Sequence, residues 1–354
     1  MTGFEADIRA QGELIRDLLS LDSDTSTLRA AASLASAGRP IVFAGMGSSL
    51  AAARPAADRL IASGRWAMAV EAGELLHYGD DALTRGSLVI LISQSGRSAE
   101  TLALGERLHS AGESRLVAVV NDPASPLAGV ANVVVPIHAG TEVTVSTKTF
   151  MASVVSLYTL ADELIGSPGL TVDLALQCDL ASRLAQVAAE PVIAAAAATA
   201  FSTVAALVVV GRGPAFAAAE YGALILKEAC AIEAEAIPGG SFRHGPIEVA
   251  GPATGIVVLA PAGRTQALSV RLAADTARLG SPTWLLTGDG YETNGSGDVS
   301  TARDLLLSDL PAVPEMLAPL LYSVPLQHLA LKLAELRGRE PGVVERSTKV
   351  TVSE

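Results

Sequence analysis

Short apolar runs alternate with amphipathic helical patterns along most of the chain. In the first half the apolar runs fall at residues 40–45, 66–71, 87–93, 115–121 and 132–137, with helical patterns at 49–63, 72–77 and 98–111. This alternation predicts β-α-β units, and strands that are apolar throughout are typical of a parallel sheet buried on both faces. A long helix is expected at 146–165, after which the sequence GSPG breaks the pattern.

The same pattern restarts after the break. Strands are expected at 205–211, 255–261, 283–288 and 303–308, and helices at 217–232, 265–279 and 315–336. The fold class is therefore α/β, with two doubly wound, flavodoxin-like parallel sheets, each a three-layer αβα unit. We expect an N-terminal helical segment at 1–38, one unit at 39–166, the other at 170–340 and a C-terminal tail at 341–354.

Composition and charge narrow the classes of function. Half of the 354 residues are hydrophobic, and the formal net charge is −12, which argues against a nucleic-acid-binding protein because such proteins normally carry a basic face. No apolar stretch reaches the roughly 20 residues of a membrane helix, and the N-terminus lacks the apolar run of a signal peptide. The two cysteines, Cys178 and Cys230, indicate neither a disulfide framework nor a cysteine metal site, so we expect a cytoplasmic protein.

Two predicted strands end in loops that are rich in hydroxyl groups and lead directly into helices. The loops are GMGSS, with Gly47, Ser48 and Ser49, and SQSGRS, with Ser93, Gln94, Ser95 and Ser98. The unpaired amides and dipole of a helix N-terminus, joined by such hydroxyls, suit an anion. Taken singly, the second loop could be explained by ordinary N-capping by Ser95 or Ser98, and capping alone could explain the first loop as well. Two such turns in one sheet favour an anionic ligand.

Neither loop matches the GxGxxG fingerprint or the P-loop pattern of nucleotide-binding proteins. We therefore expect a single phosphate or a similar oxyanion rather than a nucleotide. Because the overall negative charge repels such a ligand, local amides and dipoles must hold it.

These loops resemble the sugar isomerase (SIS) family. Five further segments resemble the isomerase half of glucosamine-6-phosphate synthase, namely GTEVTVSTKTF (140–150), GRGPAFAAAEYGALILKEACAIEAEA (211–236), FRHGP (242–246), YSVPLQHLA (322–330) and STKVTVSE (347–354). The resemblance implies two SIS subdomains in a homodimer and a sugar 6-phosphate ligand, with no cofactor and no metal. It also implies that the two hydroxyl-rich loops hold the phosphate and that Val145 and Ser146 line the sugar.

Aldose–ketose isomerisation requires a base that moves a proton between C1 and C2, a group that opens the sugar ring, and a positive charge beside the enediolate. The resemblance implies Glu228 as the base, His244 of the neighbouring subunit as the ring-opening group, and Lys349 as the cation. The tail that carries Lys349 is expected to fold over the active site. Taken without the resemblance, each of the three could be an ordinary solvated side chain.

Three departures from the synthase pattern limit what the resemblance implies. No glutaminase domain or N-terminal nucleophilic cysteine is found, so we do not expect release of ammonia from glutamine. Ile225 stands where the synthase has a lysine for amine handling, and Tyr221 and Ser241 replace acidic residues. The GTEVTVSTK loop is one residue shorter, so the rim of the sugar site is expected to differ.

The sequence therefore predicts an aldose–ketose isomerase for a hexose with a C6 anion, either a phosphate or an analogue such as a sulfonate. A fructosamine-6-phosphate deglycase, which also has an aliphatic residue at position 225, or a glucosamine-6-phosphate deaminase remains an alternative. A non-catalytic phosphosugar sensor is an alternative from another class, but a sensor would not need Glu228 and His244.

Overall fold

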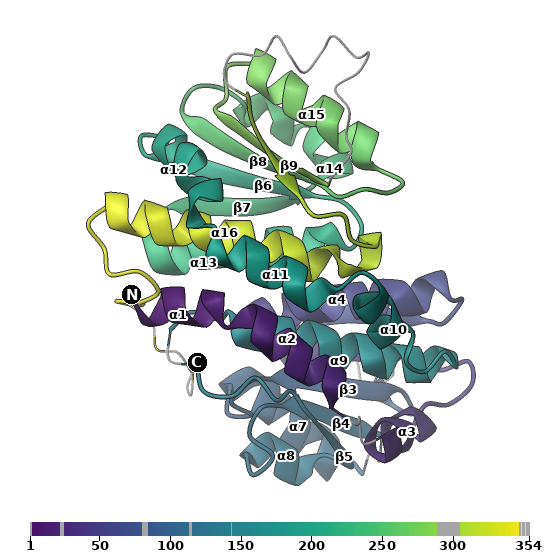
Figure 1. Ribbon diagram of the computed structural model, residues 1–354. Coiled ribbons are helices and arrows are strands. Elements are labelled where there is room, and N and C mark those ends of the chain that lie inside the picture. Colours follow the sequence, from purple (N-terminus) through teal and green to yellow (C-terminus); the bar gives the residue numbers. More distant parts are fainter. Residues whose placement is uncertain are drawn as a thin grey trace. The chain divides into compact units, whose positions relative to one another are not determined.

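The computed structural model describes residues 2–21, 25–79, 84–112, 115–142, 144–288, 305–346, 348 and 351. The chain forms two compact units (Figure 1). We call Leu14–Gln177 with Glu345–Glu354 the first unit, and Met1–Glu13 with Cys178–Val344 the second unit. Each unit holds one five-stranded parallel sheet. The predicted α/β class with two parallel sheets is confirmed.

The sheet of the first unit has the strand order β2-β1-β3-β4-β5. Its strands are β1 (Ile41–Gly45), β2 (Ala67–Glu71), β3 (Leu88–Ser93), β4 (Leu116–Val120) and β5 (Val133–Pro136). Every residue of β1, β3 and β4 is buried, as expected for strands that are covered on both faces. All five predicted strands are confirmed, each one or two residues shorter than expected.

Helices cover both faces of this sheet. One layer contains α5 (Ala72–Tyr78), α7 (Ala99–Ser110) and α8 (Pro126–Val130), whose apolar side chains pack against β1, β3 and β4. The other layer contains α4 (Gly47–Ala62) and α9 (Lys148–Ile165), which pack together, and α3 (Thr25–Ser33) and α10 (Leu170–Gln177), which contact α9. α2 (Gln11–Ser20) contains the boundary between the two units.

The sheet of the second unit repeats this topology, with the order β10-β9-β8-β6-β7. Its strands are β6 (Ala206–Gly211), β7 (Glu233–Pro238), β8 (Thr254–Ala260), β9 (Thr283–Gly288) and β10 (Leu305–Leu310). β7 was not among the predicted strands. It is an edge strand with exposed Glu233 and Glu235 and a terminal Pro238, so it lacks the continuous apolar run of a buried strand.

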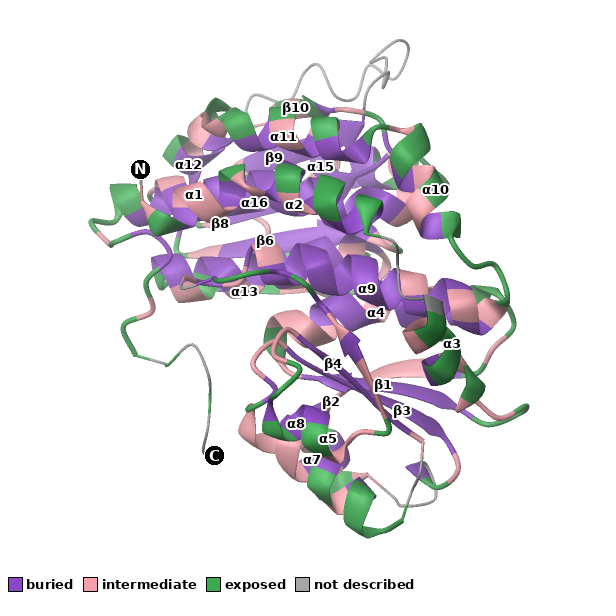
Figure 2. Cartoon of the chain, turned by 60° about the horizontal axis from the view of Figure 1, so that its bottom comes forward, coloured by how far each residue is buried: buried purple, intermediate pink, exposed green. Residues whose placement is uncertain are grey.

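In the second unit, α13 (Ala215–Cys230) and α16 (Ala318–Leu336) pack against each other, and α13 also lies on β6 and β7. The opposite face is covered by α14 (Gly239–Arg243) and α15 (Gln266–Arg278). Around α16 pack α1 (Gly3–Arg9), α11 (Leu180–Ala189), α12 (Ala195–Phe201) and the short 3-10 helices Pro191–Ala194 and Glu315–Leu317. A further 3-10 helix, Pro246–Val249, follows α14. α16 is buried almost throughout (Figure 2), as expected for a helix that is apolar on all sides.

Within the described ranges, no single helix is long and apolar enough to cross a membrane. The criterion is met only by a pair of helical segments taken together, Leu180–Ala189 and Pro191–Phe201, and the chain bends by 65° between them.

A buried ion pair joins α4 to α9 in the first unit. The carboxylate of Asp162 is fully buried, and its Oδ1 accepts a hydrogen bond of 2.8 Å from Arg59 Nε and a second bond from Arg59 Nη2. Its Oδ2 accepts the amide of Thr171 at 2.6 Å. The side chain of Arg59 is only 16% exposed, so each charge depends on the other for compensation.

Replacing Asp162 by leucine should destabilise the protein by about 3–5 kcal/mol, because it leaves the Arg59 guanidinium buried without its counter-charge. The double variant Arg59→Met/Asp162→Leu should recover much of that loss, since neither charge is then left unpaired. Urea unfolding of the single and double variants measures both effects. A double variant no more stable than the single one would contradict this account.

His328 on α16 is a buried histidine in the second unit. Its Nε2 lies 3.2 Å from the carbonyl oxygen of Val187, and its Nδ1 has no partner among the described residues. The pKa of His328 is lowered to about 4, mainly by burial and to a smaller extent by Arg9, against the opposing effects of the bond to Val187 and of Glu5. The imidazole is therefore neutral near pH 7.

Between the ordinary pKa of 6.5 and the folded value of about 4, the unfolded chain binds a proton at His328 that the folded chain does not. The free energy of unfolding should therefore fall as the pH drops through this window, with a contribution of up to roughly 3 kcal/mol from His328. In His328→Gln that contribution should disappear. Urea unfolding of both proteins at pH 7.5, 5.5 and 4.5 is the measurement, and equal losses in the two proteins would contradict it.

Candidate functional site

The first sheet reverses its winding direction between β1 and β3. β1 pairs with β2 on one side and with β3 on the other, so the connections leave in opposite directions and open a crevice beyond the carboxyl ends of the two strands. The GMGSS loop (residues 45–49) follows β1, and the SQSGRS loop (residues 93–98) ends β3. A Cβ on Gly45 would lie 3.0 Å from the Ile92 carbonyl oxygen. The fold therefore brings the two predicted loops together.

The GMGSS loop forms the first turn of α4. Gly47 has a φ of +50°, which glycine adopts readily, and Met46 occupies the N-cap position without a side-chain hydrogen bond. Gly47 is exposed, and Ser48 and Ser49 are partly exposed. Because the first amides of a helix have no carbonyl within it to bind, this turn offers amides and two hydroxyls at the positive end of a 16-residue helix.

In the SQSGRS loop, Ser93 serves mainly to shape the backbone. Its side chain is 2% exposed, and its Oγ accepts the Gly96 amide at 3.1 Å and lies 3.1 Å from Ser98 Oγ. Gly96 has a φ of +60°, and a Cβ there would lie 2.1 Å from Ser125 Oγ, so only glycine fits. Gln94, Ser95 and Ser98 are partly exposed and remain the candidates for direct ligand contact.

The C-terminal tail reaches the start of α7 within the same unit. The amide of Ala99, the first residue of α7, donates a hydrogen bond of 3.0 Å to the carbonyl oxygen of Thr351. The tail therefore occupies one amide of this helix N-terminus next to Ser98. Lys349, predicted as the catalytic cation, lies outside the described residues.

Residues 139–142 and 144–147, which we call the rim loop, precede α9 and include Val145 and Ser146. Val145 is buried and Ser146 is partly exposed. Asn121, which follows β4, anchors the beginning of the rim loop, because its side chain accepts the Ala139 amide at 2.8 Å and donates to the Gly140 carbonyl at 2.9 Å. The amide of Asn121 in turn donates to the Gln94 carbonyl at 3.0 Å. One residue thus links the rim loop to the SQSGRS loop.

Glu142 is a residue of the rim loop to which the sequence analysis assigned no role. Its buried carboxylate accepts four hydrogen bonds, two from Thr147 and two from Thr149. The sequence signal is a glutamate that precedes two threonines by five and seven positions at the start of a helix. Nothing in the sequence alone shows that the chain folds back to bring the three residues together.

Glu228 and His244 lie near opposite ends of the strands in the second unit. Glu228 is in the last turn of α13, which returns the chain to the amino end of β7, and it is partly buried. His244 is exposed and follows α14, beyond the carboxyl end of β7. The six residues of β7 separate its two ends by about 17 Å. A single chain therefore does not bring this predicted pair together.

The helix face beside Glu228 is apolar. Ile225 lies one turn before Glu228 on α13 and is fully buried. Tyr221 lies a further turn back, also fully buried, and its hydroxyl accepts a bond of 2.9 Å from Gln327 on α16. Gln327 and Gln11 exchange bonds of 2.6 and 3.0 Å. Position 225 thus contributes no ammonium group beside Glu228.

The second unit repeats the glycines of the GMGSS loop without its hydroxyls. Gly211 and Gly213 follow the pattern of Gly45 and Gly47, and the φ of Gly213 is +52°. Between them stands Arg212, whose Nε is buried without a partner among the described residues and whose guanidinium packs against Gly239. Burial lowers the pKa of Arg212, and nearby Arg243 lowers it further. Arg212 was not among the predicted site residues.

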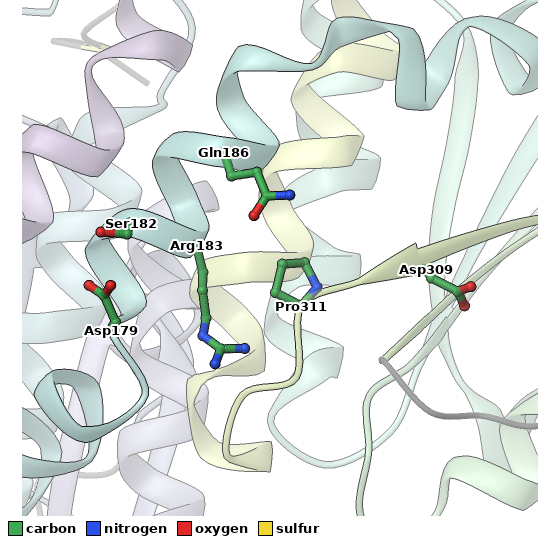
Figure 3. Close-up of a pocket in the computed structure, with 6 residues that line it drawn as sticks. All are labelled: Asp179, Ser182, Arg183, Gln186, Asp309 and Pro311. Carbon is green, nitrogen blue, oxygen red and sulfur yellow. The ribbon is translucent and has the colours of Figure 1, made fainter.

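A polar pocket of about 440 Å³ opens elsewhere in the second unit (Figure 3). It is lined by Asp179, Ser182, Arg183, Gln186, Asp309 and Pro311, none of which is a predicted site residue. Arg183 is already bonded to the carbonyl oxygens of Cys178 and Ala312. In the parts of the chain that the structure describes, no group of three or more His, Cys, Asp or Glu side chains is arranged to hold a metal ion.

Comparison with known proteins identifies relatives of this chain. Residues 33–162 match the family model of the SIS domain. The glutamine–fructose-6-phosphate aminotransferase (isomerizing) of Zymomonas mobilis is 32% identical over 280 residues, which are 77% of this chain and 45% of that protein. The chain thus matches less than half the length of this relative.

Solved structures share the fold over nearly the whole chain. The C-terminal domain of glucosamine-fructose-6-phosphate aminotransferase from Francisella tularensis has a TM-score of 0.80 at 22% identity, covering 97% of this chain and 98% of that one. Glucosamine-6-phosphate deaminase from Thermotoga maritima has a TM-score of 0.75 at 19% identity, with 99% of both chains covered. Tagatose-6-phosphate ketose/aldose isomerase from Escherichia coli also has a TM-score of 0.75, at 20% identity, covering 96% of this chain and 94% of that one. These likenesses show that the fold is shared. The matched SIS domain and the 32% identical relative show that the chain belongs to the sugar isomerase (SIS) family.

Proposed function

We propose that the chain is an aldose–ketose isomerase for a hexose that carries a phosphate, or a comparable oxyanion such as a sulfonate, at C6. The observation that carries this proposal is the crevice between β1 and β3, where the GMGSS and SQSGRS loops meet at two helix N-termini. Amides and hydroxyls in this arrangement suit one compact oxyanion. Membership of the SIS family supports a phosphosugar as its carrier.

The anion would be held by Ser48 and Ser49 with the amides of Gly47 and Ser48, and by Gln94, Ser95 and Ser98 from the other loop. Ser93 would act indirectly, through its bonds to Gly96 and Ser98. The first amide of α7 is bonded to Thr351, so α4 would supply the larger share of amides to the ligand. The sugar ring would extend from this anchor toward Val145 and Ser146 of the rim loop.

The chemistry would move one proton between neighbouring carbons. His244 would open the ring by taking the proton from the anomeric hydroxyl and returning one to the ring oxygen. The Glu228 carboxylate would remove the proton from C2 of the open aldose, and the electron pair of that C–H bond would form the C1–C2 double bond. Lys349 would stabilise the negative charge on the enediolate while the proton of the O2 hydroxyl passes to O1. Glu228 would then return its proton to C1, and C2 would become the carbonyl carbon of the ketose.

The separation of Glu228 from His244 supports a composite active site in a homodimer. Because about 17 Å separates the two ends of β7, His244 of one chain would act with Glu228 of a second copy. A two-fold symmetric dimer would then contain two equivalent sites, each with residues from both chains.

The buried apolar face beside Glu228 favours isomerisation over amine transfer. Ile225 and Tyr221 provide no cation or carboxylate there, and Tyr221 is tied to Gln327. A plain isomerase needs only the proton shuttle. A fructosamine-6-phosphate deglycase or a glucosamine-6-phosphate deaminase would use the same shuttle and expel an amine or ammonia, and a sensor would bind without exchange.

Proton NMR in heavy water tests the proposal. Incubated with fructose 6-phosphate, glucose 6-phosphate, glucosamine 6-phosphate, a fructosamine 6-phosphate and a 6-sulfo hexose, the protein should exchange the C1 or C2 hydrogen of a hexose that carries no amino group, without releasing nitrogen. Glu228→Gln should lower exchange by at least about a hundredfold and leave ligand affinity nearly unchanged, because it removes the base and keeps the shape. The control is Glu335→Gln, on the exposed end of α16.

Each outcome of this experiment identifies one of the candidate functions. Release of ammonia or of an amine would identify a deaminase or a deglycase in place of an isomerase. Tight binding of a phosphosugar without any exchange in the wild type would support the sensor and remove the roles given to Glu228 and His244.

A mixed dimer tests the composite site. Glu228→Gln and His244→Ala chains with different tags should each be inactive as homodimers, while the co-expressed mixed dimer should have about half of the wild-type activity. The reason is that one of its two sites would receive both intact residues and the other would receive neither. If both residues acted within one chain, each site of the mixed dimer would lack one of them, and activity would stay at the level of the homodimers.

A further inference from the structure

We propose that Glu142 is a positioning residue, whose buried carboxylate holds the rim loop in the shape that presents Val145 and Ser146 to the sugar. This inference rests on the proposed function, in which the rim loop contacts the sugar. Glu142 would not touch the reacting atoms. It would act through the backbone of the loop that does.

The contacts of Glu142 lie in a buried setting. Glu142 is 7% exposed, Thr147 is fully buried and Thr149 is 4% exposed. Oε1 accepts the amide and hydroxyl of Thr147, both at 2.8 Å, and the amide of Thr149 at 3.1 Å. Oε2 accepts the hydroxyl of Thr149 at 2.8 Å. Four donors therefore converge on one carboxylate, and hydrogen bonds to an ionised acceptor are stronger than neutral ones.

The carboxylate also caps α9. Thr147 occupies the N-cap position of this 18-residue helix but makes no side-chain cap bond, and its hydroxyl donates to Glu142. Instead Glu142 accepts the amide of Thr149, in the first turn of α9, and places a negative charge at the positive end of the helix. Because α9 is largely buried in the first unit, the cap attaches the rim loop to a fixed element.

The same bonds close the part of the rim loop that carries the proposed sugar contacts. Val145 and Ser146 lie between Glu142 and Thr147, which are joined through the carboxylate. Lys148 Nζ donates to the Thr141 carbonyl at 2.6 Å, which closes the loop a second time. The SQSGRS loop is shaped by separate bonds, those of Ser93. Loss of Glu142 should therefore disturb sugar contacts and leave anion binding intact.

Binding measurements on three variants test this separation. The variants are Glu142→Ala, Glu142→Gln and the control Glu106→Ala, an exposed position on α7. Calorimetry would give their affinities for inorganic phosphate, and turnover assays would give KM for the hexose 6-phosphate that the wild type turns over. Glu142→Ala should bind phosphate as the wild type does, and its KM for the hexose 6-phosphate should rise about tenfold to a hundredfold. Glu142→Gln should recover part of this, because its amide oxygen can still accept three of the donors and the Thr149 hydroxyl can accept from its amide nitrogen.

Hydrogen exchange measures the loop itself, without ligand. In Glu142→Ala the amides of Thr147 and Thr149 should exchange faster than in the wild type, while those of β3 and α4 keep their rates. If the alanine variant does not fold, Glu142→Gln is compared with the wild type instead. The amides of Thr147 and Thr149 should again exchange faster, by a smaller factor.

The outcomes separate the inference from the proposed function. Wild-type KM for the hexose 6-phosphate in Glu142→Ala would overturn the inference alone. So would equal losses of phosphate and sugar-phosphate affinity, because Glu142 would then support the whole unit. A wild-type protein that binds inorganic phosphate but no hexose with a C6 phosphate or sulfonate would overturn the proposed function, even if Thr147 and Thr149 exchanged faster in Glu142→Ala.

Discussion

The close approach of β1 and β3 at their carboxyl ends is the constraint on which the candidate site depends. Gly45 leaves room for the Ile92 carbonyl only because it has no side chain, and α4 begins two residues later, at Gly47. Two helix N-termini and their hydroxyls consequently share one crevice. In the second sheet Gly211 is equally confined, since a Cβ there would lie 2.8 Å from the Ala215 carbonyl oxygen. The glycine belongs to the topology, and the residues that follow it decide what the crevice binds.

The two units have diverged at those following positions. In the second unit Pro214 and Ala215 stand where the first has Ser48 and Ser49, which removes two hydroxyls and one amide donor. Arg212 brings a guanidinium to the same turn and packs it against Gly239. Under the proposed function the turn of the first unit would bind the anion, and the turn of the second, without those hydroxyls, would not. One topology thus occurs twice, but only one copy has the groups that suit an anion.

The sequence predicted the parts of this molecule that depend on local pattern. Buried strands were found to within two residues because a parallel sheet requires continuous apolar runs. β7 was missed because an edge strand with Glu233 and Glu235 lacks such a run. The GMGSS and SQSGRS loops were found from their hydroxyls and glycines, but the inward role of Ser93 was not. Glu142 was missed because its function depends on a fold-back over five residues, and Lys349 lies beyond what the structure describes.

Short-range contacts, rather than net charge, must determine anion binding in a chain of charge −12. The one cation of the SQSGRS loop, Arg97, faces Asp122 at 3.6 Å on the surface, and such exposed pairs contribute little. Amides, hydroxyls and helix dipoles lose their effect within a few ångströms, so their value depends on placement. This is why Gly45, Gly96 and Ser93, which touch no ligand in the proposal, matter as much as the serines that would. The same principle applies to Glu142 and the sugar. A negative side chain can support the binding of an anionic ligand when its carboxylate accepts hydrogen bonds from groups behind the site.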